Sequence, residues 1–149
     1  MTLALDSAFG SVLLDNTGAI LAYALVGLVL FVIGFYVVDL ATPGRLISVI
    51  RHEKNPNASL LASAAMISVG IIVAASIYAS DADLLEGLIA TGVYGLIGIV
   101  AQTVAMLVFN LLIGLKIKDI CQEEHLEPAT WMLAVTYVMI GFVTAFAVI

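Results

Sequence analysis

Long apolar stretches alternate along the chain with short polar ones. Four stretches contain no Asp, Glu, Lys or Arg, and they cover residues 16–38, 55–80, 87–115 and 128–149. Each is long enough to cross a bilayer, because a transmembrane helix needs about 20 predominantly apolar residues. Their apolar residues lie all round the helix rather than in one stripe, which favours spans over surface helices. The pattern predicts four transmembrane helices, at about 17–38, 58–79, 87–113 and 129–149.

Composition agrees with this prediction. Of the 149 residues, 63% are hydrophobic and 11% are charged, whereas a soluble domain is usually about half apolar and a quarter charged. The net charge of -6, with five basic residues, argues against a nucleic-acid partner. We therefore expect an all-α membrane protein with one membrane domain over residues 1–149.

The basic residues predict the orientation. Arg45, Arg51 and Lys54 lie between the first two predicted spans, and Lys116 and Lys118 lie between the last two. Short loops rich in Lys and Arg stay in the cytoplasm, so both termini are expected outside. The residues before the first span include no Lys or Arg, unlike a cleaved signal peptide, which favours a retained span.

The sequence matches itself at an offset of 71 residues. The aligned pairs include Tyr23 with Tyr94, Gly27 with Gly98, Gly70 with Gly141, and Asp39 with Asn110. This predicts a duplicated two-helix hairpin, with repeats at about 13–79 and 84–149. Because each repeat contains two spans, both copies enter the membrane from the same side, as in a parallel repeat.

A polar turn follows the first span. Thr42, Pro43 and Gly44 predict a short helix that Thr42 caps and Pro43 begins. The apolar and polar residues that follow alternate as in an amphipathic helix on the inner leaflet. Asn57 is expected to cap the second span, and Pro128 to start the fourth.

These features resemble a known family. The segment 39–44, the polar loop with Asn55 and Asn57, and the small-residue span at 58–75 look like the domain of unknown function 350 family. The resemblance extends over essentially the whole chain in length, number of spans and tandem duplication. In the second repeat, Leu-Ile-Gly at 112–114 replaces the Ala-Thr-Pro step. The resemblance implies the bacterial inner membrane and no established activity.

Four polar residues are candidates for a pathway or a helix interface: Asp39, Gln102, Thr103 and Asn110. Asp39 is either hydrated or paired with Arg45 at the end of its span, or else it lines the inner mouth of a pathway with Asn110. The other three are expected to hydrogen-bond between helices, although Gln102 is also placed to contact a solute or a neighbouring subunit. The remaining hydroxyls are expected to bond their own helix backbone, at Ser63, Ser68, Ser76, Thr136 and Thr144.

Small residues predict close helix packing, within one chain or between chains. The glycines concerned are Gly27, Gly34, Gly92, Gly95 and Gly98.

The sequence contains no motif typical of an enzyme, a metal site or a bound cofactor, and none of the three is expected. The favoured hypothesis is a non-enzymatic, self-assembling or complex-forming membrane subunit. Its expected partners are the lipid bilayer, further copies of itself, and proteins that dock on the loops at 40–57 and 114–127. The alternative is a small channel or transporter with a polar path near the third span, although no span carries the buried charge typical of an ion-coupled carrier.

Overall fold

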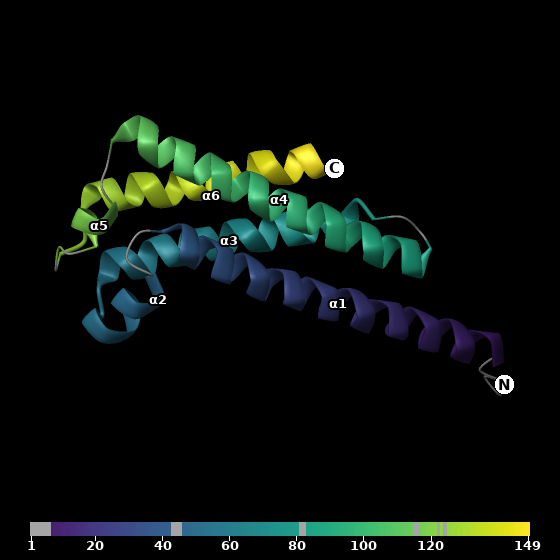
Figure 1. The fold of residues 1–149 in the computed structure, drawn as a ribbon. Coiled ribbons are helices and arrows are strands. Elements are labelled where there is room, and N and C mark those ends of the chain that lie inside the picture. Colours follow the sequence, from purple (N-terminus) through teal and green to yellow (C-terminus); the bar gives the residue numbers. More distant parts are fainter. Residues whose placement is uncertain (1–6, 43–45, 81–82, 115–116, 122, 124) are drawn as a thin grey trace.

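A computed structural model describes residues 7–42, 46–80, 83–114, 117–121, 123 and 125–149. Four of its helices are long and apolar enough to cross a membrane, as the sequence predicts. They are α1 (Ser7–Ala41), α3 (Pro56–Tyr78), α4 (Leu84–Ile113) and α6 (Pro128–Val148). Two of the connections contain short elements. The connection between α1 and α3 contains α2 (Leu46–Ser48) and the π-helical turn η1 (Val49–Glu53), and the connection between α4 and α6 contains α5 (Ile117–Ile120). Both connections lie at the same end of the bundle, and the termini lie toward the other (Figure 1).

The helices differ in length from one another and from the predicted spans. The 35 residues of α1 and the 30 of α4 make helices of about 52 and 45 Å, longer than the hydrocarbon core of about 30 Å. The 23 residues of α3 and the 21 of α6 match that core closely. The first helix begins ten residues before the predicted span, because a charged residue ends an apolar stretch without ending a helix.

The central helix is α3. It packs against α1, α4 and α6, and Figure 1 shows it between α1 and α6, with α4 crossing the bundle. In its most apolar window, 56% of the residues are buried, against 17% in α1 and 22% in α4. The outer faces of α1 and α4 are therefore rows of exposed aliphatic side chains, which suit contact with lipid or with another protein.

Small residues let the helices approach closely. At Gly34, Gly95 and Gly98, an added Cβ would lie 2.5 or 2.6 Å from a side chain of a neighbouring helix. At Gly27 the corresponding distance is 3.4 Å. These four glycines pack within the chain, but Gly92 has no atom within 4 Å of the equivalent position.

The closest approach is between α3 and α6. A Cβ built at Gly141 would lie 2.8 Å from the Cα of Ser68, so a larger residue cannot fit without moving a helix. Beside this contact, Tyr137, Leu61, Ile72 and Leu133 are fully buried. Such packing takes the place of the hydrophobic effect inside a membrane, where lipid is as apolar as the side chains.

Candidate functional site

The connection between α1 and α3 and the connection between α4 and α6 are held together by Asn57, whose side chain is completely buried. Its Nδ2 donates to the carbonyl oxygens of Glu123 at 3.1 Å and His125 at 2.8 Å. Its Oδ1 accepts from the backbone N–H of Glu127 at 2.9 Å and from the hydroxyl of Thr130 at 2.7 Å. One amide therefore satisfies three groups from the segment that leads into α6 and one from the first turn of α6.

Asn55 makes a parallel connection. Its Nδ2 donates to the carbonyls of Cys121 at 2.7 Å and Glu123 at 2.9 Å. Its Oδ1 accepts from the N–H of Ala58 at 3.0 Å, which caps the start of α3. We call Asn55 and Asn57, with their partners between residues 121 and 130, the asparagine clasp.

The prediction that Asn57 caps the second span is wrong. Pro56 occupies the first helical position, where its missing N–H costs nothing, and the residue before it is therefore the cap. Asn57 lies one residue inside the helix and its side chain faces the other connection instead. The prediction that Pro128 starts the last helix is confirmed.

Thr42 directly follows the last residue of α1. Its hydroxyl donates to the Val38 carbonyl at 2.9 Å, and its backbone N–H donates to the same oxygen at 3.1 Å. The next described helix begins at Leu46, and the prediction that Thr42 caps a helix beginning at Pro43 stays a prediction. Pro43 and Gly44, the rest of the predicted turn, lie outside the described residues.

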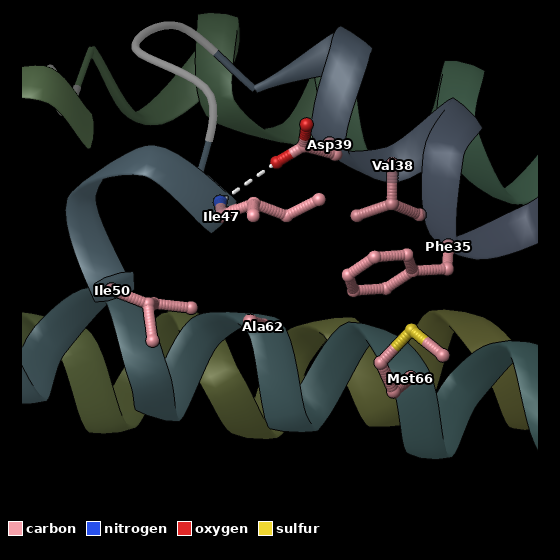
Figure 2. A pocket seen from close by; sticks show the side chains of 7 residues that line it. All are labelled: Phe35, Val38, Asp39, Ile47, Ile50, Ala62 and Met66. Atoms are coloured by element: carbon pink, nitrogen blue, oxygen red, sulfur yellow. Dashed lines mark hydrogen bonds between the residues drawn. The ribbon is translucent and has the colours of Figure 1, made fainter. Parts of the chain in front are cut away.

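Asp39 is buried near the C-terminal end of α1. One of its carboxylate oxygens accepts a hydrogen bond of 2.9 Å from the backbone N–H of Ile47 (Figure 2). This bond fastens α2 to the end of α1. Arg45, the partner considered from the sequence, lies outside the described residues.

A small cavity adjoins Asp39, where α1, α2 and α3 meet. Figure 2 shows its lining: Phe35, Val38, Asp39, Ile47, Ile50, Ala62 and Met66. Its volume of about 10 Å³ is at most enough for one water molecule. The cavity is too small to serve as the mouth of a pathway through the chain.

Asn110 bonds to a different helix. Its side-chain amide meets the hydroxyl of Tyr137 on α6, with Nδ2 at 2.9 Å and Oδ1 at 3.1 Å from the oxygen. This is the kind of contact between helices expected from the sequence. Asp39 therefore bonds to Ile47 and Asn110 to Tyr137, so the two residues have different partners.

The two other candidates bond within α4. The hydroxyl of Thr103 donates to the Ile99 carbonyl at 2.7 Å. Gln102 is completely buried, and its Nε2 lies 3.7 Å from the sulfur of Met106. Its Oε1 has no hydrogen-bond partner within the part of the chain that the structure describes. The bonds expected between helices are therefore not found at these two residues.

A contact missed from the sequence involves Ser68. Its hydroxyl donates to the Tyr137 carbonyl on α6 at 2.8 Å, whereas a bond to its own helix was expected. The other four hydroxyls bond their own helix as predicted, at Ser63, Ser76, Thr136 and Thr144. Only the short distance to Gly141 brings the carbonyl within reach, and nothing in the local sequence signals that distance.

The single cysteine, Cys121, lies beside the asparagine clasp. Burial raises the pKa of the Cys121 thiol, and the nearby Glu53 carboxylate raises it further. The thiol therefore stays neutral near pH 7, where a nucleophile or metal ligand would need to be a thiolate. Within the described residues, no three His, Cys, Asp or Glu side chains are grouped as metal ligands.

Together these elements define an all-helical membrane protein with four apolar helices long enough to span a bilayer. The chain belongs to the family described as Domain of Unknown Function (DUF350), whose profile matches residues 11–148. It is 35% identical to a UPF0719 transmembrane protein of Mycolicibacterium paratuberculosis, over 91% of this chain and 89% of that protein. A UPF0719 transmembrane protein of Mycobacterium bovis is 33% identical over the same shares. No solved structure matches the chain significantly.

Proposed function

We propose that this protein is a non-enzymatic membrane subunit that assembles with further copies or with other proteins, and that its two inner loops form the docking surface. The observation that carries the proposal is the asparagine clasp. Through it, the segments around residues 55–57 and 121–130 become one surface instead of two independent loops. A preorganised surface loses less conformational freedom when a partner binds.

The exposed side chains on this surface suit a protein partner. Arg51, Lys54, Asp119, Glu123 and His125 all face solvent. Mixed charges of this kind give specificity and orientation to an encounter. The polar groups beneath them have their hydrogen bonds within the clasp, which favours a binding surface over a reaction site.

Self-assembly is supported by α4. Gly92 leaves open space on a half-buried part of this helix, and small residues let a second helix approach closely. We expect the mass of the purified protein in mild detergent, corrected for bound detergent, to be a multiple of 15.6 kDa or to include a co-purifying partner. A stable lone monomer without a partner would contradict the proposal.

A matched pair of variants locates the contact. A Cβ added at Gly92 or at Gly18 has no atom within 4 Å, so both Gly92→Leu and Gly18→Leu are expected to leave the fold of the monomer intact. If α4 carries the contact between copies, Gly92→Leu lowers the assembled mass and Gly18→Leu leaves it unchanged. An unchanged mass in both variants would place the contact elsewhere.

The alternative function, a small channel or transporter, is supported by Gln102. A buried carbonyl without a donor is unfavourable by about 1–3 kcal/mol, and such groups are often retained for function. Flux of ions and small cations into reconstituted vesicles, compared with Gln102→Leu, tests this function. Flux that the substitution abolishes would favour the channel over the assembly role.

We further propose that the chain lies in the bacterial inner membrane with both termini outside, since all five basic residues lie in the loops at 40–57 and 114–127. We also propose the duplication at about 13–79 and 84–149. At the offset of 71, Asn110 and Tyr137 correspond to Asp39 and Met66, which border one cavity. Protease added to spheroplasts, whose outer membrane has been removed, should cleave off an N-terminal tag, and protection of the tag would contradict this orientation.

A further inference from the structure

A second, larger hollow lies beside the connection between α1 and α3. It is a groove of about 410 Å³ between the end of α1 and the α2–η1 segment. One part of its lining is largely apolar, from Tyr36, Leu40 and Ile47, and another is polar, from Ser48, Arg51 and His52. Tyr36 and Leu40 are 57% and 70% exposed, on the last turns of a membrane-spanning helix. The groove therefore lies where lipid headgroups meet the protein.

The backbone beside the groove has an unusual form. Residues Val49–Glu53 form a π-helical turn, and Lys54 ends it with a φ of 50°. Both conformations are uncommon, and both are frequent at functional sites. Here Val49 and Ile50 pack against the core, while Arg51 and His52 remain exposed.

We propose that this groove binds a phospholipid, with its phosphate at Arg51, His52 and Ser48 and its acyl chains along Tyr36 and Leu40. A guanidinium presents several N–H donors in a planar fork that matches a phosphate. The apolar part of the lining continues along α1 toward the hydrocarbon, so an amphiphile fits both parts. A soluble anion would use only the polar one.

Asp39 also lines this groove, and its charge opposes that of a phosphate. However, it is only 8% exposed, and one of its oxygens is held by the Ile47 N–H. A phosphate entering from the membrane surface therefore meets the exposed Arg51 guanidinium and His52 imidazole first.

The stoichiometry follows from the second hairpin and rests on the proposed duplication. At the offset of 71, Tyr36, Arg51 and His52 correspond to Leu107, Gln122 and Glu123. The second hairpin thus has no basic residue at the positions that correspond to Arg51 and His52, and one bound phospholipid per chain is expected.

The test is native mass spectrometry of the full chain in detergent, titrated with phosphatidylglycerol or with diacylglycerol, which has no phosphate. The wild type should hold one phosphatidylglycerol and no diacylglycerol. Arg51→Gln combined with His52→Gln should weaken binding at least about tenfold, as expected for the loss of charge-assisted hydrogen bonds. Lys54→Gln is the matched control, because it removes a basic residue of the same segment that does not line the groove.

Three outcomes would overturn the proposal. The double variant could bind as the wild type does, Lys54→Gln could weaken binding equally, or inorganic phosphate could displace the lipid at equal concentration. Circular dichroism of each variant establishes that the helices are intact. The assembled mass, measured on the same samples, reports on the proposed function independently of lipid binding.

Discussion

The asparagine clasp yields the sharpest prediction, through Asn57→Ala. The substitution removes the partner of the His125 carbonyl, the Glu127 N–H and the Thr130 hydroxyl. The Glu123 carbonyl keeps its bond from Asn55. Each buried polar group left unpaired costs about 1–3 kcal/mol, although groups near the surface regain water. We expect a total loss of about 3 kcal/mol in the free energy of unfolding.

Thermal unfolding of the purified protein in detergent, followed by circular dichroism, measures this loss. For a chain of this size, 1 kcal/mol lowers Tm by about 2–4 °C, so Asn57→Ala should lower it by about 6–12 °C. Asn57→Asp should lower it as much, because its second oxygen would face the carbonyls of Glu123 and His125 in place of a donor. Ser63→Ala is the control, since the exposed Ser63 bonds only to its own helix.

The reasoning would be refuted if Asn57→Ala melted within about 1 °C of Ser63→Ala. A double-mutant cycle with Thr130→Val adds a stricter check, because that substitution removes only the hydroxyl. The two residues share a hydrogen bond of 2.7 Å, and directly contacting residues show coupling energies of about 0.5–3 kcal/mol. Strictly additive effects would mean that the bond contributes nothing.

Three further predictions concern other parts of the bundle. Gly141→Ala should lower the free energy of unfolding by about 1–3 kcal/mol, because the new Cβ meets Ser68. Gly92→Ala is the control and should not destabilise the protein. Equal melting temperatures of the two variants would contradict this prediction. Gln102→Leu should leave the protein as stable or up to about 2 kcal/mol more stable, since it removes an unpaired buried carbonyl, and a lowered Tm would show that Gln102 has a partner. Maleimide labelling of Cys121 should be slow at pH 8 and faster in Glu53→Gln, because removing that negative charge lowers the pKa of the thiol; an unchanged rate would exclude this effect.

The sequence predicts the spans well because their physical cause is local. A stretch without charged residues is sufficient to identify a membrane-crossing helix, and Pro128 marks the start of the last one. The clasp is not predictable in this way. The partners of Asn57 lie 66–73 residues away and include backbone groups, which no side-chain pattern reveals.

The glycines show the same limit. Five small residues on two helices predict close packing, but only the arrangement of the bundle shows that Gly92 lies apart from any neighbour in the chain. It also reveals Gly141, beside Ser68, as the tightest contact between α3 and α6. Sequence spacing identifies the face of a helix, whereas the neighbour that covers it depends on tertiary structure.

The separation in sequence between the two sides of the clasp has a consequence for biogenesis. At a synthesis rate of about 5–20 residues per second, the 66–73 residues between Asn57 and its partners take about 3–15 s to emerge. Until residues 121–130 have been made, the side chains of Asn55 and Asn57 lack these partners. The last connection thus completes the clasp, and a chain interrupted before residue 121 would leave both asparagines without their partners from residues 121–130.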